Sequence, residues 1–309
     1  MLTSLTIRDE QAALLALVES AKSPWHTVAD LVEAAGSASA VVRGDVQSED
    51  AADIALLNQV RSLTLGFAVE RWHRALEDLA RTAPAVHLVT VLDPAYPRNL
   101  RMVYNRPPFL FVRGELRTED ENAVAIVGTR EPSSHGLAEA SALAEALSRK
   151  DVTIISGLAR GIDTSVHEAT LRAGGRTLAV IGTGIRRTYP PENEQLAQRI
   201  VGSGGALISQ FWPDAPPMAS NFPLRNAVMS GMAIGTVVIE ASSTSGAKMQ
   251  ARLALEHGKR LFLLESLVLS QDWARRYADR PGAVVVKRSS DVLEILAQAS
   301  RPAEQLQLA

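Results

Sequence analysis

The sequence predicts an α/β protein with a doubly wound, mostly parallel sheet that follows a small N-terminal all-helical domain. From about residue 122 onward, short apolar runs alternate with amphipathic stretches, and turns that contain glycine separate them. The apolar runs are nearly continuous, which is typical of strands that helices cover on both faces. Residues 1–83 instead carry apolar side chains at helical spacing.

The first part of the chain is predicted to form the helical domain, over residues 1–83. Apolar runs at helical spacing occur at 14–18 and 54–60, and Gly36 and Gly44 interrupt the pattern. Pro84 then ends it. We therefore expect a second domain over residues 84–299 and an unstructured tail over 300–309.

Two extended segments should connect the helical domain to the main sheet, at His87–Leu92 and Pro107–Gly114, and the second is entered through prolines. The strands expected after them are Ala123–Val127, Val152–Ser156, Thr177–Ile181, Ala206–Ser209, Thr236–Glu240, Arg260–Leu264 and Ala283–Val286. Helices are expected near residues 135–149, 163–173, 192–203, 225–234, 246–257 and 290–298.

Composition limits the classes of function. The 309 residues are 46% hydrophobic, enough for a substantial core. No apolar run is as long as a membrane span and the first residues do not resemble a signal peptide, so we expect a cytoplasmic protein without a membrane partner. Cysteine is absent and the six histidines never occur as H-E-x-x-H, so neither a thiol nor a zinc site is expected.

Charge is distributed unevenly along the chain. Residues 1–85 hold 7 Lys or Arg against 12 Asp or Glu, whereas residues 125–260 hold 14 against 11. The formal net charge of the whole chain is only −2. The excess of basic residues in the middle indicates that this part binds an anion.

Turns rich in glycine and hydroxyl residues follow the predicted strands. In an open parallel sheet, ligands bind beyond the carboxyl ends of the strands, where helix N-termini offer unpaired N–H groups to anions. Arg130 and Arg160 lie in two of these turns and add charge-assisted hydrogen bonds. The turns are Gly128-Thr129-Arg130, Ser156 to Gly161, Gly182-Thr183-Gly184 and Ser242 to Gly246.

Motifs of several enzyme classes are missing. The Gly182 turn lacks the third glycine of a dinucleotide fingerprint, and no G-x-x-x-x-G-K-[ST] is present. Ser156 stands in Ile154-Ile155-Ser156-Gly157 and not in a G-x-S-x-G elbow. No nucleophile, base and orienting residue form a set. We therefore predict a binding protein with no catalytic residue and no cofactor.

Two segments combine an aromatic ring, a proline and an amide. Tyr189 and Asn193 occur in the segment after the third predicted strand, and Phe222 precedes Arg225 and Asn226 just before a short apolar helix. Bases of a single strand stack on exposed rings, and arginine neutralises phosphate. These segments favour single-stranded DNA as the anion.

The ordered series of motifs resembles the DNA-processing protein A (DprA/Smf) family. The resemblance covers about residues 90–260. Each motif alone is weak, but their order is specific. The matching segments are Asp93 to Pro97, Val127 to Arg130 with Gly136, Ser156 to Asp163, Gly182 to Gly184, Tyr189 to Asn193, Asn221 to Asn226, Val238 to Ala241 and Ser245-Gly246.

This resemblance implies an extended Rossmann-like domain after a helical domain of sterile-alpha-motif type. It also implies a homodimer that binds single-stranded DNA and loads a RecA-type recombinase onto it in natural transformation. The DNA-binding residues would be Gly128, Thr129, Arg130, Ser156, Gly157, Arg160, Gly161, Gly182, Thr183, Gly184, Tyr189, Asn193, Phe222, Arg225, Asn226, Ser245, Gly246 and Lys248.

The chain departs from the family pattern in several places. Ala227 follows the Arg-Asn pair where a basic residue is usual, and Gln210 stands where an acid is usual. Ala247-Lys248-Met249 replaces a hydroxyl and a Leu-Ile pair, and Glu265-Ser266-Leu267 with a helix around Trp273 replaces a proline-glycine loop. These changes bear on the partner and on the physiological role.

Two alternatives stay open at this point. The same pocket would suit a sensor of a nucleotide-derived ligand, acting in defence signalling, because binding needs no catalytic acid. A related class of nucleoside phosphate hydrolases carries P-G-G-x-G-T-x-x-E, which the segment from Ser242 to Lys248 lacks. The other alternative is a defence or regulatory protein that acts through a second protein. Its contact surfaces would be Trp273, Tyr277 and the acidic helical domain.

Overall fold

The computed structural model describes residues 4–299. Its first part is entirely helical, and Gly36 and Gly44 adopt positive φ where α2 and α3 end. Asp50 caps the next helix by accepting from the N–H groups of Ala52 and Asp53. The helices of this part are α1 (Ser4–Ser20), α2 (Trp25–Ala35), α3 (Ala38–Arg43), α4 (Ala51–Arg61) and α5 (Gly66–Thr82).

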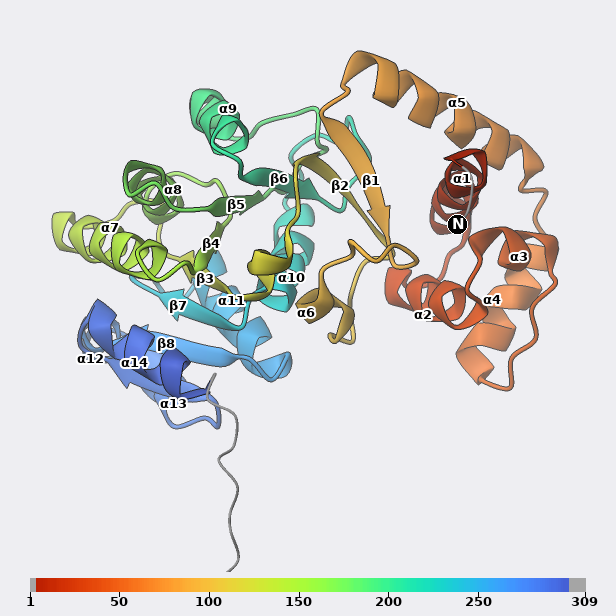
Figure 1. The fold of residues 1–309 in the computed structure, drawn as a ribbon. Helices are drawn as coiled ribbons and strands as arrows, with labels where there is room; N and C mark the ends of the chain where they lie inside the picture. The colour runs from red at the N-terminus through yellow and green to blue at the C-terminus, as the bar shows by residue number, and fades with distance from the viewer. Residues whose placement is uncertain (1–3, 300–309) are drawn as a thin grey trace, which may run out of the picture.

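The rest of the described chain is built around a nine-stranded sheet, whose strands lie in the order β1-β2-β6-β5-β4-β3-β7-β8-β9 (Figure 1). The strands from β6 to β9 run parallel, whereas β1 and β2 are antiparallel additions at one edge. Their bounds are β1 Val86–Thr90, β2 Phe109–Gly114, β3 Ala123–Val127, β4 Thr153–Ser156, β5 Thr177–Val180, β6 Ala206–Ser209, β7 Gly235–Val238, β8 Arg260–Leu264 and β9 Ala283–Val286.

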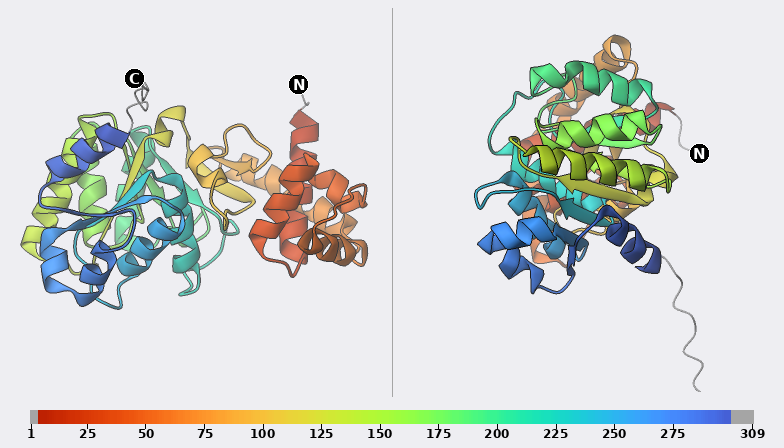
Figure 2. Two further views of the ribbon diagram at one scale, coloured as in Figure 1. Left: turned by 90° about the horizontal axis from the view of Figure 1, so that it is seen from below. Right: turned by 90° about the vertical axis from the view of Figure 1, so that its left-hand side faces the viewer.

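Helices cover both faces of this sheet, as Figure 2 shows. On one face α7 and α8 pack together, and on the other α10 packs against α11. The helices are α6 Arg98–Arg101, α7 Ser134–Ser148, α8 Ile162–Arg172, α9 Glu194–Gly202, α10 Asn221–Met232, α11 Gly246–Glu256, α12 Glu265–Ser270, α13 Asp272–Ala278 and α14 Ser289–Ala299, with 3₁₀ turns at Thr118–Glu121 and Pro191–Asn193. The predicted doubly wound α/β fold with an N-terminal helical part is confirmed.

The helical part packs against β2 and the segment after β6 through aromatic rings. The Trp212 ring lies 4.9 Å from that of Trp72 in α5, and it stacks on Phe109 of β2 at 5.3 Å. Trp25 of α2 completes the cluster, 5.9 Å from Trp212. We call these four residues the aromatic interface. The domain boundary at residue 83 stays a prediction, with α5 ending at Thr82 and β1 beginning at Val86.

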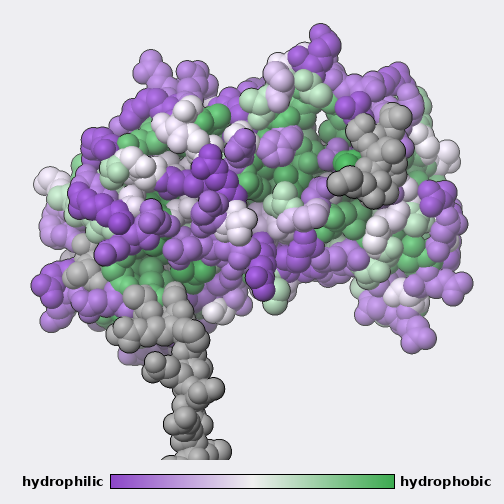
Figure 3. Space-filling model, in the orientation of Figure 1, coloured by the Kyte–Doolittle hydropathy of each residue, from purple (hydrophilic) through white to green (hydrophobic). Residues whose placement is uncertain are grey.

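Ion pairs surround the aromatic interface. Glu33 of α2 accepts hydrogen bonds from Arg101 and from Arg106, the latter at 2.7 Å. Arg186, in the loop after β5, pairs with Asp78 of α5 at 3.3 Å. Most of the face seen in Figure 3 is hydrophilic. No helix within residues 4–299 combines the length and apolar character needed to cross a bilayer.

Two expectations need correction. The helix expected near 225–234 begins at Asn221, so Phe222 and Arg225 lie on α10 and not in a turn before it. Pro223 is tolerated there because first-turn residues have no intrahelical acceptor for an N–H. Trp273 is only 2% exposed, and its Nε1 donates to the carbonyl of Ala241 at 3.1 Å, so it is not available as a contact surface. The tail expected at 300–309 lies outside the described residues.

Candidate nucleic-acid interface

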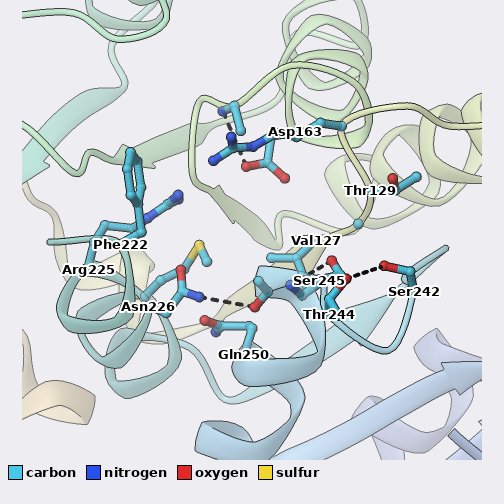
Figure 4. A pocket seen from close by; sticks show the side chains of 16 residues that line it. Val127, Thr129, Asp163, Phe222, Arg225, Asn226, Ser242, Thr244, Ser245 and Gln250 are labelled. Carbon is cyan, nitrogen blue, oxygen red and sulfur yellow. Dashed lines mark hydrogen bonds between the residues drawn. The ribbon is translucent and has the colours of Figure 1, made fainter. Parts of the chain in front are cut away.

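The candidate site lies at the carboxyl ends of the central strands, where the strand order reverses. β3 has β4 on one side and β7 on the other, so the loops after β3 and β7 diverge and leave a crevice. A cavity of about 410 Å³ opens there, which we call the central pocket. Figure 4 shows its walls, with Thr129 after β3, Ser242, Thr244 and Ser245 after β7, and Phe222, Arg225 and Asn226 on α10.

Phe222 contacts two guanidinium groups at this pocket. The Cζ atom of Arg130 lies 5.6 Å from its ring centroid and that of Arg225 lies 5.9 Å away. Arg130 is exposed, and no carboxylate of residues 4–299 forms an ion pair with it. Tyr189, which is 40% exposed, places its ring 6.2 Å from that of Phe222. Two cations and two rings therefore face the same opening.

Arg225 is a buried cation in the wall of the pocket. It is 5% exposed, and its Nη1 donates to the carbonyl of Val180 at 3.3 Å. Its Nε is buried without a hydrogen-bond partner among the described residues. A Cβ at Gly157 would overlap the guanidinium, so the observed position of Arg225 requires glycine there. Burial lowers the pKa of Arg225 and the charge of Asp163 opposes this, so the group stays protonated.

Asp163, in the first turn of α8, supports this arrangement. Its Oδ2 accepts from the N–H of Gly157 at 3.1 Å and from that of Ala159 at 3.3 Å. Burial raises the pKa of this carboxyl, while Arg225 and the two N–H groups favour its ionised form. The preceding Gly161 adopts φ +76°, where its backbone approaches Thr129 closely. Asp163 thereby fixes the β4–α8 loop beside Arg225.

A smaller hollow extends from the central pocket toward Tyr189, and Arg160 lies at its edge. The Arg160 guanidinium donates to the Glu192 carboxylate. This hydrogen bond lowers the pKa of Glu192, so the two charges largely neutralise each other. The two exposed arginines of the site thus differ, since within residues 4–299 Arg160 has an acidic partner and Arg130 does not.

Many of the residues predicted for the site come together around these two cavities. The structure gathers Gly128, Thr129, Arg130, Gly157, Arg160, Tyr189, Phe222, Arg225, Asn226, Ser245 and Gly246. Their clustering follows from the parallel topology, which brings the carboxyl ends of β3, β4, β5 and β7 to one rim. Whether each of them contacts DNA stays a prediction.

The remaining predicted residues do not line these cavities. Ser156, Thr183 and Asn193 are buried, and their side chains donate to the carbonyls of Ile126, Arg187 and Leu158. Lys248 bonds the carbonyl of Ser243 at 3.1 Å. Gly161, Gly182 and Gly184 lie against neighbouring backbone or the Phe222 ring. Some small polar residues after the strands therefore stabilise loops through hydrogen bonds to backbone carbonyls, whereas others line a pocket.

Several pocket residues were not predicted. Asp163 belongs to the quoted motif, and its place in the first turn of a helix after a glycine loop was the available signal. Met229 and Gln250 lie on the inner faces of α10 and α11, and nothing in their sequence spacing distinguishes them from core residues. Glu240 accepts from the N–H of Ser133 at 2.9 Å and so fixes the loop before α7.

Comparison with known proteins identifies relatives of the chain. Residues 87–297 match the family described as DNA recombination-mediator protein A. The chain is 37% identical over 214 residues to the protein Smf of Escherichia coli K12, covering 69% of this chain and 57% of that protein. It is 35% identical over 206 residues to the DNA processing protein DprA of Streptococcus pneumoniae, covering 66% and 72%.

Solved structures agree with these matches. The DprA structure from Streptococcus pneumoniae has a TM-score of 0.69 at 27% identity, over 91% of this chain and 95% of that one. DNA processing protein A from Helicobacter pylori, described for its single-stranded DNA binding mode, shares the fold with a TM-score of 0.61 at 23% identity, over 69% and 96%.

The chain spans little more than half the length of its Escherichia coli relative. The family match nevertheless covers most of the sheet and the whole rim on which the central pocket lies. The predicted resemblance is confirmed, and the chain belongs to the DNA recombination-mediator protein A family, whose members include the DprA and Smf proteins.

Proposed function

We propose that this chain binds single-stranded DNA along the rim of its sheet, with phosphates at Arg130 and Arg225 and bases on Phe222 and Tyr189. The observation that carries the proposal is the contact of both guanidinium groups with the Phe222 ring at the central pocket. Arginine neutralises phosphate, and an exposed ring stacks on a base. The description of the Helicobacter pylori relative as a single-stranded DNA binder supports the same ligand.

Single strands suit this surface better than duplexes do. Rings can stack only on bases whose faces are free, and a duplex hides them. The cations contact phosphates, which carry no sequence information, so binding should be independent of sequence. Arg225 lines the same pocket, and its positive charge attracts an anion that enters there.

Arg130 and Arg160 offer a matched pair for testing the proposal. Both are exposed arginines at the rim, but only Arg160 has a carboxylate partner. Arg130→Gln should weaken binding of a single-stranded oligonucleotide about tenfold and reduce the slope of log K against log salt by about one. Arg160→Gln should change either quantity much less. Fluorescence anisotropy across a salt series measures both.

Two outcomes of the anisotropy titrations would contradict the proposal. One is an affinity of wild type that does not depend on salt, and the other is an equal affinity for duplex and single-stranded DNA. Equal effects of Arg130→Gln and Arg160→Gln would show that bulk charge matters and the pocket does not. Thermal unfolding of each variant checks that the fold is intact.

The proposal extends to the recombinase. Membership of a recombination-mediator family supports a role in loading a RecA-type recombinase onto the bound strand in natural transformation, as a cytoplasmic homodimer. Strand exchange on DNA already covered by a single-strand-binding protein tests this role, because a loader restores filament growth there. Sedimentation measures the oligomeric state. No stimulation of strand exchange would leave a DNA-binding protein without the loading function.

One observation favours a second candidate, a sensor of a nucleotide-derived ligand in defence signalling. The central pocket, at about 410 Å³, lies within the range of about 300–1,000 Å³ that is usual for small-ligand sites. A thermal-shift screen distinguishes the two, because a ligand that binds only the folded state stabilises it by RT ln(1 + [L]/Kd). A shift with one nucleotide and none with an oligonucleotide would favour the sensor.

A further inference from the structure

A third hollow continues the rim beyond the central pocket, and the proposed function does not use it. It has a volume of about 310 Å³ and shares Thr129 and Ser242 with the central pocket. Its far wall is formed by Ser266, Ser270 and Gln271, from α12 and the residue after it. We call it the α12 hollow. It lies one strand farther along the sheet, because β8 follows β7 in the strand order.

This wall lies next to α13, the helix that holds Trp273. The Trp273 ring is buried and its Nε1 donates to the carbonyl of Ala241, which itself lines the hollow. Leu267 of α12 is buried as well. The wall is therefore fixed to the β7 loop by a hydrogen bond and by packing.

The chemistry of the hollow differs from that of the central pocket. Among the described residues, no lysine or arginine lines it, whereas the acidic residue Glu240 does. A phosphate is therefore disfavoured, because that carboxylate would repel it. The groups that remain are the hydroxyls of Ser242 and Ser266 and the amide of Gln271.

Gln271 is the most informative of these groups. Its side chain has no hydrogen-bond partner within the described residues, although it is half-buried. An amide presents donors and an acceptor together, which is the pattern found on the edges of nucleobases. Leu267 and Ala241, each less than 5% exposed, form its apolar floor. The hollow thus resembles a base site and not a phosphate site.

We infer that the α12 hollow receives the base of the nucleotide next to the one held in the central pocket. The inference rests on the proposed binding of single-stranded DNA. It adds a contact with a base, whereas the arginines contact phosphates. The strand then runs from Tyr189 across Phe222 to Gln271, along the carboxyl ends of β5 to β8.

A double-mutant cycle between protein and DNA tests this inference. Wild type and Gln271→Ala are titrated with oligothymidylates in which one abasic nucleotide is moved through the sequence. Gln271→Ala should weaken binding of the intact oligonucleotide about fivefold, a loss typical of one hydrogen-bonding group. At one abasic position, wild type and Gln271→Ala should bind the oligonucleotide with equal affinity, because the base that Gln271 contacts is already missing. The salt slope should remain that of wild type.

Two further variants sharpen the test. Ser266→Leu, at an exposed position, fills the hollow and should show the same dependence on one abasic position. Asp272→Asn is the control, because Asp272 pairs with Arg275 and does not line the hollow. Additive effects of Gln271→Ala and the abasic site at every position would overturn the inference and leave the proposed function intact. Failure of wild type to bind any oligonucleotide would overturn both.

Discussion

The rim of the sheet and the aromatic interface use the same residue types for opposite purposes. At the aromatic interface, Arg101 and Arg106 both pair with Glu33. At the rim, Arg225 is buried with an unused donor and Arg130 has no carboxylate partner among the described residues. A buried charge is costly unless it is paired. The interface therefore contributes to stability, whereas the rim keeps its cations available for a ligand at some cost in stability.

Two half-buried aromatic residues allow this contrast to be tested directly. Trp212 contacts Trp25, Trp72 and Phe109, whereas Phe222 contacts two guanidinium groups and Tyr189. Both residues occur in the segment between β6 and the first turn of α10. Truncating either removes a ring of similar exposure, so a difference in outcome reflects the surroundings.

The largest effect is expected from Trp212→Ala. Loss of a packed tryptophan should lower the free energy of unfolding by about 3–4 kcal/mol, because the cavity it leaves cannot close fully. The affinity of the folded protein for single-stranded DNA should change by less than about twofold. Urea denaturation measures the first quantity and anisotropy the second. A large loss of affinity at unchanged stability would contradict the division between the two regions.

Phe222→Ala should give the converse result. A stacked base is worth about 1–3 kcal/mol, so affinity for single-stranded DNA should fall by about tenfold or more. The unfolding free energy should fall much less than in Trp212→Ala, because the ring lies at an opening and contacts cations. Phe222→Tyr is the control, since it keeps the ring and should retain most of the affinity. Equal binding by Phe222→Ala and wild type would remove this ring from the site.

Glu33→Gln tests the electrostatic part of the interface. Partial burial opposes ionisation of Glu33, but hydrogen bonds from Arg101 and Arg106 outweigh it and lower its pKa. An acid with a lowered pKa stabilises the fold above its unfolded-state pKa, and this contribution is lost as pH falls through the folded-state value. Glu33→Gln should therefore be about 1 kcal/mol less stable at pH 7, allowing for solvent screening, and the difference from wild type should shrink as pH falls toward 3.

Urea midpoints at the two pH values measure this difference. Glu70→Gln is a suitable control, because Glu70 forms an exposed pair with Arg74 on α5 and such pairs contribute little. A difference between Glu33→Gln and wild type that was as large at pH 3 as at pH 7 would indicate that packing, and not charge, is responsible.

Much of the fold follows from local patterns in the sequence. The strands Ala123–Val127, Ala206–Ser209, Arg260–Leu264 and Ala283–Val286 have the predicted bounds, because continuous apolar runs between glycine turns leave few alternatives. The helix expected near 225–234 begins earlier, at Asn221, because Pro223 fits within the first turn of a helix as well as before one.

The site was less predictable than the fold. Arg130 and Arg225 were predicted because their residue type alone suggests anion binding. Ser156 and Asn193 have the same polar character as pocket residues, but their hydrogen bonds to Ile126 and Leu158 depend on tertiary packing. Gln271 was not predicted, because only the placement of α12 after β8 brings it to the rim. The local sequence around it does not indicate that placement.

The smallest effect is expected at Glu192. This residue pairs with Arg160 at the rim, as Glu33 pairs with Arg101 beside the aromatic interface. Glu192 neutralises Arg160, so Glu192→Gln should free that guanidinium for a phosphate. Affinity for single-stranded DNA should rise about two- to threefold, and the salt slope should steepen by up to about one. The double variant Arg160→Gln, Glu192→Gln should return to the wild-type slope.

Because removing an acid anywhere raises the net charge, Glu194→Gln on α9 is the control for long-range attraction. An equal gain from Glu194→Gln would mean that the overall field attracts DNA and that pairing within the rim has no separate effect.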